Sequence, residues 1–454
     1  MTDAAESAEH GDLRDDMRAL VIVPVLKQQH PKGETATTAP RSNEAKLEEA
    51  IGLARAIDIE IAGGLIVPVA QPRPATLMGT GKVAEIGEQA KAENAGLIIV
   101  DHPLTPVQQR NLEREWKCKV IDRTGLILEI FGRRASTKEG TLQVELAHLN
   151  YQKGRLVRSW THLERQRGGA GFMGGPGETQ IEADRRGLQD KIIKLERELE
   201  QVRRTRQLHR AKRRKVPHPI VALVGYTNAG KSTLFNRITG AGVLAEDMLF
   251  ATLDPTLRRM KLPQGRTVIL SDTVGFISNL PTHLVAAFRA TLEEVLEADL
   301  ILHVRDMSDP DNAAQAGDVM RILADLGIEG QEVDDRILEV WNKIDRLEPE
   351  AHEAIADKAT TTANVRAISA VTGEGVDALM EEISQRISGV MTEVTIDILP
   401  AKLSLLPWLY ANAMVDERRD QEDGSVSLDI RISAAASGEL ERKLGTVKSK
   451  KDEW

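Results

Sequence analysis

The fold of this 454-residue chain is decided by residues 225–232, which read Gly225-Tyr226-Thr227-Asn228-Ala229-Gly230-Lys231-Ser232. The stretch follows an apolar run over 220–224 and precedes a predicted helix over 233–238. A G-x-x-x-x-G-K-S spacing between a strand and a helix is typical of a phosphate-binding loop. In such a loop backbone N–H groups turn toward phosphate oxygens, the lysine reaches the β- and γ-phosphates, and the serine binds Mg²⁺. We therefore predict that Lys231 and Ser232 bind a nucleoside triphosphate and its magnesium ion.

A second motif follows the apolar run over 337–340 and reads Asn342-Lys343-Ile344-Asp345. The N-K-x-D pattern selects guanine, because its carboxylate accepts hydrogen bonds from the guanine N1–H and exocyclic amine, a pair of donors that adenine lacks. A predicted strand over 365–368 ends at Ser369-Ala370, where a backbone N–H is expected to meet the guanine O6. Together these segments predict GTP as the substrate.

Two further segments are expected to sense the γ-phosphate. Asp272-Thr273-Val274-Gly275 follows a predicted strand over 267–270 and has the D-x-x-G pattern of switch II. We expect Asp272 to hold Mg²⁺ through water and the Gly275 N–H to contact the γ-phosphate. Thr252 is the expected switch I ligand of Mg²⁺, within the nucleotide-contacting run Phe250-Ala251-Thr252-Leu253-Asp254. All these motifs in this order indicate a GTP-hydrolysing domain.

The composition limits what the rest of the chain can be. Aromatic residues make up 3 % of it, so the cores must be aliphatic, and Cys118 is the only cysteine, which excludes a disulfide framework and a cysteine-cluster metal site. The net charge of −9 argues against a generally basic nucleic-acid-binding coat. No apolar run approaches the roughly 18 residues of a membrane span, and the acidic stretch 1–16 does not resemble a signal peptide. We expect a monomeric, cytoplasmic protein whose residues 1–16 are disordered.

Positive charge is nevertheless concentrated locally. Residues 203–215 contain eight Lys and Arg and no acidic residue, and a second cluster comprises Lys153, Arg155, Arg158, Arg165 and Arg167. Such runs form either a solvated helix face or a contact with the RNA phosphate backbone, and the sequence alone leaves both open.

Besides the N-terminal extension, the chain divides into four parts, which predicts a multidomain α/β protein. Residues 17–137 alternate strand-like and helical runs, as an α/β domain with a mainly parallel sheet does. The other parts are a helical arm over 138–215, the G domain over 217–389, and a small α+β domain over 392–454 of strand-helix-strand order with a charged tail. In the first domain, strands are predicted over 20–26, 64–69, 97–101 and 119–122, and helices over 44–56, 82–94 and 106–116.

Apolar spacing predicts that the arm is an antiparallel pair of helices. One seam contains Leu142, Leu146, Leu149, Leu156, Trp160 and Leu163, and the other contains Leu188, Ile192, Leu195, Leu199 and Val202. A kink is expected at Gly154 in the first helix. The loop between the helices has six glycines among the eleven residues 167–177. Such a loop cannot bury a core. It is therefore either a flexible loop that extends to a contact with a partner or an ordinary linker.

These motifs resemble the HflX family of translation-factor-class GTPases, from about residue 18 to the end of the G domain. The most specific segments are Gly174-Gly175-Pro176-Gly177-Glu178-Thr179-Gln180, Asp272-Thr273-Val274-Gly275-Phe276-Ile277-Ser278-Asn279-Leu280-Pro281 and Leu77-Met78-Gly79-Thr80-Gly81-Lys82. The resemblance implies GTP-dependent binding to the large (50S) ribosomal subunit, through 23S rRNA and ribosomal proteins. It also implies splitting or rescue of stalled ribosomes under heat or other stress, with the Gly-rich loop near the peptidyl-transferase centre.

Hydrolysis at such a site depends on positioning and charge stabilisation. Phe276 follows Gly275, where many GTPases have a water-orienting glutamine. We therefore expect slow intrinsic hydrolysis that the ribosome accelerates. The Asn228 side chain is expected either to bind a K⁺ ion beside the phosphates or to stiffen the loop by local hydrogen bonds.

Two other interpretations stay open. The chain could be a GTP-gated switch that binds RNA or protein in ribosome assembly or storage, with hydrolysis only as a timer. The N-terminal domain could bind ATP through Gly79-Thr80-Gly81-Lys82, although a short G-x-G-K is more often an ordinary turn before a helix.

Overall fold

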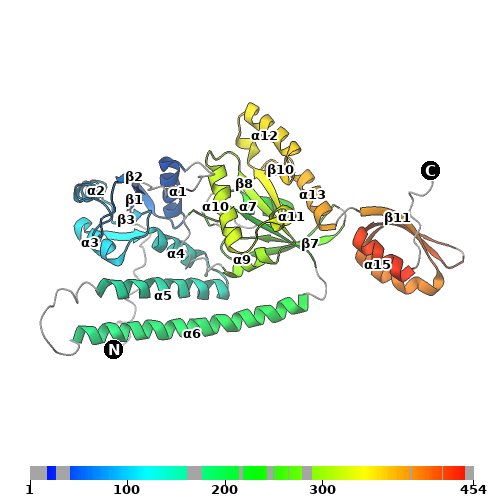
Figure 1. Ribbon diagram of the computed structural model, residues 1–454, viewed down its shortest axis with the longest axis horizontal. Helices are drawn as coiled ribbons and strands as arrows, with labels where there is room; N and C mark the ends of the chain where they lie inside the picture. The colour runs from blue at the N-terminus through cyan, green and yellow to red at the C-terminus, as the bar shows by residue number, and fades with distance from the viewer. Residues whose placement is uncertain are drawn as a thin grey trace.

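The computed structural model describes residues 18–26, 41–160, 176–213, 218–242, 249–250, 252–263, 265–278, 289–388, 391–421 and 423–444. They form an N-terminal α/β domain, a two-helix hairpin, a larger α/β domain and a small C-terminal α+β domain (Figure 1). This architecture confirms the expected fold class. The predicted N-terminal extension, most of the Gly-rich loop, Ala251, the run 279–288 and the end of the tail lie outside the described residues.

The N-terminal domain is built on a parallel sheet with strand order β2-β1-β3-β4. Successive side chains of a strand point to opposite faces, so Ala19 and Val21 pack on one side and Leu20 and Ile22 on the other. Helices α1 and α4 cover the first face, and α2 and α3 cover the second. The elements are β1 (Arg18–Leu26), α1 (Asn43–Arg55), β2 (Glu60–Val69), α2 (Thr80–Ala92), β3 (Leu97–Val100), α3 (Pro106–Trp116), β4 (Lys119–Asp122) and α4 (Arg123–Arg134).

Two features of this domain bear on the sequence analysis. Helix α4 was not predicted from the sequence, and its residues 123–128, Ile130 and Phe131 are buried. The Gly79-Thr80-Gly81-Lys82 segment starts helix α2, and Lys82 pairs with Glu85 of the same helix at 2.7 Å. The turn interpretation of this segment is therefore favoured over an ATP site.

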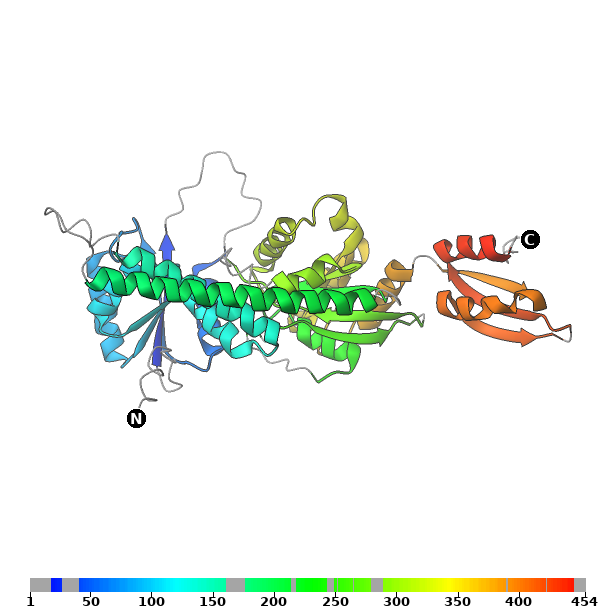
Figure 2. The ribbon, with the colours of Figure 1, turned by 90° about the horizontal axis from the view of Figure 1, so that it is seen from below.

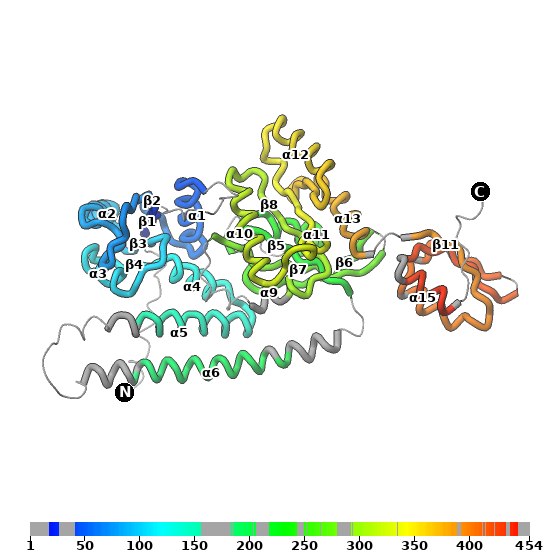
Figure 3. The backbone as a smooth tube through the Cα atoms, in the orientation of Figure 1, coloured from blue at the N-terminus to red at the C-terminus, as the bar shows by residue number. Residues whose placement is uncertain are grey.

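The arm is a hairpin of α5 (Lys138–Trp160) and α6 (Pro176–Arg213), which run side by side (Figure 3). The two predicted seams meet in one apolar cluster, in which Leu142 and Leu149 pack against Ile192, Leu195 and Leu199. A kink was expected at Gly154, and α5 continues through this residue as one helix. Viewed from below, α6 crosses both α/β domains (Figure 2), so the hairpin spans the length of this part of the molecule.

The G domain has a six-stranded sheet of order β10-β9-β8-β5-β7-β6, parallel except for β6. Alternate residues of β5 again face opposite sides, where α9 and α10 cover one face and α7 and α13 the other. Its elements are β5 (Ile220–Gly225), α7 (Lys231–Thr239), β6 (Thr256–Lys261), β7 (Thr267–Asp272), α9 (Arg289–Leu296), β8 (Leu300–Asp306), α10 (Asn312–Asp325), α11 (Gln331–Arg336), β9 (Ile337–Asn342), η3 (Ile344–Arg346), α12 (Pro349–Thr361), β10 (Val365–Ala367) and α13 (Val376–Ser388). The loops after the parallel strands share the edge where ligands bind in open α/β sheets.

The C-terminal domain packs two helices on an antiparallel sheet of order β11-β13-β12. The predicted strand-helix-strand order was incomplete, because it missed the charged edge strand β12. Charged side chains suit an exposed edge, and Arg419 of β12 pairs with Asp429 of β13 at 2.6 Å. The elements are β11 (Met391–Ile398), η4 (Pro400–Leu405), α14 (Leu406–Asn412), β12 (Ala413–Asp420), β13 (Val426–Ser433) and α15 (Ala434–Leu444). No described helix of the whole chain is both long and apolar enough to cross a bilayer.

Candidate functional site

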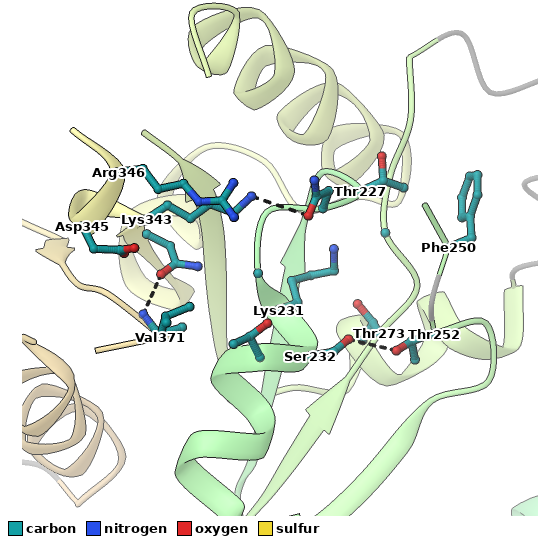
Figure 4. Close-up of a pocket in the computed structure, with 16 residues that line it drawn as sticks. Thr227, Lys231, Ser232, Phe250, Thr252, Thr273, Lys343, Asp345, Arg346 and Val371 are labelled. Carbon is teal, nitrogen blue, oxygen red and sulfur yellow. Dashed lines mark hydrogen bonds between the residues drawn. The ribbon is translucent and has the colours of Figure 1, made fainter. Parts of the chain in front are cut away.

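A cavity of about 290 Å³ opens at the carboxyl edge of the G-domain sheet (Figure 4). Residues from the phosphate-binding loop, both switch segments and the N-K-x-D region meet in it, although they are far apart in sequence. Its lining comprises Thr227, Asn228, Gly230, Lys231, Ser232, Thr233, Phe250, Thr252, Thr273, Gly275, Asn342, Lys343, Asp345, Arg346, Ala370 and Val371. Thr233, Arg346 and Val371 were not among the predicted residues.

The phosphate-binding loop holds Lys231 at the cavity wall. Its Nζ donates to the Tyr226 carbonyl oxygen at 2.7 Å, and burial lowers the pKa of Lys231 to about 8 although the Asp272 carboxylate opposes this. Gly230 has φ +91°, and a Cβ there would lie 2.2 Å from the Asn342 Nδ2, so only glycine fits. The charge of the buried Lys231 is thus only partly compensated by Asp272, which favours the binding of phosphate oxygens beside it.

The three predicted magnesium-site residues lie together. The hydroxyls of Ser232 and Thr252 donate to Asp272 Oδ2 at 2.8 and 3.0 Å, and the two hydroxyls are 3.0 Å apart. Burial raises the pKa of Asp272 although Lys231 opposes this, and Asp272 Oδ1 is buried without a hydrogen-bond partner among the described residues. This oxygen donor set fits Mg²⁺, which when bound would neutralise phosphate charge.

Replacement of Ser232 by alanine should therefore raise the Mg²⁺ concentration needed for half-maximal hydrolysis. Loss of one oxygen contact to a charged group corresponds to about 1.5–3 kcal/mol, or roughly tenfold or more in apparent affinity. Magnesium titration of turnover measures the effect, with Thr239→Ala at the far end of α7 as the control. An unchanged titration curve would remove Ser232 from the metal site.

Switch II lies directly against the phosphate-binding loop. A Cβ on Gly275 would come within 2.9 Å of Thr227 Cα and 3.1 Å of Lys231 Nζ. Two backbone hydrogen bonds fix this approach, from Thr227 N to Phe276 O at 2.8 Å and from Phe276 N to Gly225 O at 3.0 Å. The Phe276 side chain is buried in the core and does not line the cavity, so it cannot orient a water molecule there.

The guanine-reading segments are joined by Asn342. Its Nδ2 donates to the Ala229 carbonyl oxygen at 2.8 Å, and its Oδ1 accepts from the Ala370 N–H at 3.0 Å. A backbone N–H of Ser369-Ala370 was expected to meet guanine O6; in this structure the Ala370 N–H is bonded to Asn342, and the Ser369 N–H is bonded to the Glu374 carbonyl oxygen at 2.9 Å. Asp345 lines the cavity from η3 with an exposed side chain, so its carboxylate is accessible to a base.

Lys343 occupies the left-handed region with φ +64°. Its Nζ pairs with Asp306 Oδ2 at 2.8 Å and approaches Asn228 Oδ1 at 3.5 Å. Lys343 thus links the base-reading segment to the phosphate-binding loop.

Several predicted residues do not line the cavity. The residues outside its lining are Gly225, Ala229, Asp272, Val274, Ile344 and Ser369, and Ala251 lies outside the described residues. The side chains of Tyr226, Leu253 and Asp254 make contacts with the N-terminal domain or the hairpin instead.

The contact around Tyr226 was not anticipated from sequence. Its phenol donates to Glu49 of α1 and accepts from the Ser278 N–H at 2.8 Å. Arg123 of α4 donates to Glu49 Oε1 and to the Ser278 carbonyl oxygen, each at 2.8 Å, and Arg41 donates to Glu49 Oε2 at 2.5 Å. The arginines and Glu49 are almost fully buried. Burial would raise the pKa of Glu49, but Arg123 and Arg41 hold it below its usual value.

A phosphate-binding loop, an oxygen site for Mg²⁺, two switch segments and an N-K-x-D segment on one parallel sheet define a P-loop GTPase. Family models cover the chain in four parts: GTP-binding GTPase N-terminal over 44–132, GTP-binding GTPase Middle Region over 134–213, 50S ribosome-binding GTPase over 220–343, and HflX C-terminal domain over 354–454. The chain belongs to the HflX family of GTPases.

Relatives of this family match over most of the chain. It is 48 % identical to GTPase HflX of Magnetococcus marinus over 400 residues, which cover 87 % of this chain and 91 % of that one. It is 48 % identical to GTPase HflX of Escherichia coli over 361 residues, covering 80 % and 83 %. A solved GTP-binding protein from Sulfolobus solfataricus in complex with GDP is 25 % identical, covering 82 % and 98 %, with a TM-score of 0.44.

Proposed function

We propose that this GTPase binds the 50S ribosomal subunit in its GTP state and splits or rescues stalled ribosomes, under heat or other stress, as a cytoplasmic monomer. The observation that carries the proposal is the α5–α6 hairpin, whose helix α6 runs along both α/β domains (Figures 1 and 2). Support comes from the match of residues 220–343 to a 50S ribosome-binding GTPase model.

Contacts with 23S rRNA would be made mainly to its phosphate backbone, because no surface of stacking aromatics was found in the sequence. Two members of the second basic cluster are already engaged within the protein. Arg155 pairs with Asp122 at 2.8 Å, and Lys153 donates to Gln189 of the partner helix. The basic run 203–215 at the end of α6 is thus the stronger candidate for phosphate contacts, together with contacts to ribosomal proteins.

In the catalytic step we assign each group a part in positioning or charge stabilisation. Lys231 and Mg²⁺ neutralise the phosphates, Thr252 orders switch I, and the Gly275 N–H orders switch II. No side chain at position 276 positions the attacking water, so intrinsic hydrolysis is slow and the ribosome completes the site.

Sedimentation of 70S ribosomes in sucrose gradients tests the proposal. With the protein and GTP, or a non-hydrolysable analogue, the 70S peak should decrease and the 30S and 50S peaks should increase. With GDP the profile should stay unchanged. Binding to 50S subunits without any separation of 70S particles would instead favour a GTP-gated switch in assembly or storage.

Replacement of residues 168–177 by a short polar turn should strongly reduce splitting while basal GTP hydrolysis stays nearly intact. Binding to 50S subunits should fall less, because the basic contacts along α6 remain, and it should weaken steeply with salt because binding releases counterions from the phosphates. A Gly/Ser segment of the same length keeps the reach and flexibility of the loop and serves as the control. Undiminished splitting by the short-turn variant would eliminate this role of the loop.

A further inference from the structure

Asp254 of switch I is bonded to the beginning of the hairpin. Its Oδ2 accepts from the Ser136 N–H and hydroxyl, each at 2.9 Å, and from the Thr137 N–H at 2.8 Å, while its Oδ1 accepts from the Thr137 hydroxyl at 2.6 Å. Thr137 in turn accepts from the Gly140 N–H at 3.0 Å, in the first turn of α5. The Thr137 side chain therefore caps α5, and one carboxylate of the G domain binds this capping residue and Ser136 before it.

The electrostatics of this contact favour a charged Asp254. Burial would raise the pKa of its carboxyl, but the hydrogen bonds from Thr137 and Ser136 hold it below its ordinary value. A negative charge at the N-terminus of α5 is also stabilised by the helix dipole. The contact thus has both a defined geometry and a favourable charge.

Asp254 is only two residues from Thr252, whose hydroxyl lies in the metal site with Ser232 and Asp272. Leu253 between them is buried in the apolar cluster shared with the N-terminal domain. Phe250 also belongs to this cluster. Its ring packs edge-on against the ring of Phe131 of α4, with the two ring centroids 4.9 Å apart. This short segment therefore faces the nucleotide on one side and the N-terminal domain and arm on the other.

The hairpin is also bonded farther along α5. Tyr151 donates to Asp122 Oδ1 at 2.6 Å, and Arg155 donates to Asp122 Oδ2 at 2.8 Å. Helix α5 thus bridges the two α/β domains, since Ser136 and Thr137 directly before it are bonded to the G domain and its second half is bonded to the N-terminal domain.

We propose that Asp254 is the joint through which the nucleotide state of switch I sets the position of the α5–α6 hairpin. A Mg²⁺ ion held by Ser232, Thr252 and Asp272 would take the place of the direct contact between the Thr252 hydroxyl and Asp272, so the switch I segment would adjust when GTP and Mg²⁺ bind. Only two peptide units connect Thr252 to Asp254. A shift of Thr252 by about an ångström or more therefore either moves Ser136 and Thr137 at the start of α5 or breaks their hydrogen bonds to Asp254. GTP and GDP would thereby favour different positions of the arm, because a ligand shifts a protein toward the arrangement that it binds more tightly.

The neighbouring glycine supplies an independent way to disturb the joint. A Cβ on Gly140 would lie 2.4 Å from Asp254 Oδ1, so Gly140→Ala should displace the carboxylate without removing it. Gly154 lies farther along the same helix, and a Cβ there would meet nothing within 4 Å. Gly154→Ala is therefore the matched control for an alanine placed in α5.

Distance measurement between spin labels tests the joint in the full-length free protein. One label is placed at Lys194→Cys on α6 and the other at Glu350→Cys on α12, both at exposed positions, in a Cys118→Ser background. The parent protein and Gly154→Ala should give different distance distributions with GDP and with a non-hydrolysable GTP analogue plus Mg²⁺. In Asp254→Ala and Gly140→Ala this nucleotide-dependent difference should be lost, while GDP affinity measured alongside shows that the fold is kept.

The proposal would be overturned if Asp254→Ala and Gly140→Ala both kept the difference in distance distribution between the two nucleotides that the parent protein shows. So would identical distributions with the two nucleotides in the parent protein. Because no ribosome is present, failure of this experiment is distinct from failure of the ribosome-splitting proposal, which the sedimentation profiles decide.

Discussion

Asp345→Asn should lose most of its affinity for GTP and gain affinity for xanthosine triphosphate. The carboxylate of Asp345 accepts from the two guanine donors, whereas an asparagine amide presents a donor in place of one acceptor. Xanthine carries a carbonyl where guanine has its amine, so the exchanged pattern becomes complementary again. A two-point contact of this kind is worth about 1–3 kcal/mol for each correct pairing. Competition of the two nucleotides against a fluorescent analogue measures the exchange.

Asp357→Asn is a suitable control for this experiment. It removes the same charge from an exposed position on α12, twelve residues along the chain from Asp345, and it lies outside the cavity. Its relative affinity for the two nucleotides should stay as in the parent protein. Hydrolysis of GTP by Asp345→Asn with an unchanged KM would show that the guanine site has been assigned wrongly.

The nucleotide site could be largely predicted because its determinants are local. Gly230, Lys231 and Ser232 act through the conformation of a short loop between β5 and α7, and every motif except switch I lies at the carboxyl end of a parallel strand. The carboxyl ends of such strands share one edge, so the order of the motifs fixes their meeting place. The sequence motifs therefore predict both the chemical roles of these residues and the place where they meet.

Contacts between domains have no comparable local pattern. Glu49 and Tyr226 are 177 residues apart, and Ser136 and Asp254 are 118 residues apart. Tyr226 and Asp254 lie within nucleotide-binding motifs, which led to their assignment to the nucleotide although their side chains turn toward the other domain or the arm. The outward direction of a side chain depends on what packs behind the loop, and a single sequence does not contain that information.

The buried charges of this interface have a specific energetic consequence. Arg41, Glu49 and Arg123 are removed from water, and their mutual bonds offset a desolvation penalty of several kcal/mol for each ion. Removing one member alone leaves an uncompensated buried charge. Such a cluster therefore favours one defined arrangement of the two domains over many similar ones, which suits a contact beside both the phosphate-binding loop and switch II.

Hydrolysis should be faster in KCl than in NaCl at equal ionic strength, both with and without ribosomes. The position of Phe276 in the core leaves no side chain there to orient water or to offset transition-state charge. An arginine finger that supplies such charge accelerates hydrolysis by about 10³–10⁵, and a K⁺ ion bound by Asn228 would act in the same place. Asn228 lines the cavity, and its Oδ1 meets only the Lys343 Nζ, at the long distance of 3.5 Å, among the contacts of the described residues. The expected difference between the salts is on the order of tenfold or more.

Two substitutions distinguish a potassium ligand from a residue that merely shapes the loop. Asn228 has φ +61°, a conformation that asparagine tolerates and glycine adopts freely, whereas alanine is strained there. Asn228→Gly therefore removes the side-chain oxygen and preserves the backbone, and Asn228→Ala disturbs both. If Asn228 binds K⁺, the glycine variant should lose the preference for KCl while its affinity for GTP stays near the parental value. If Asn228 only shapes the loop, the glycine variant should keep the parental rates, and those rates should be equal in the two salts.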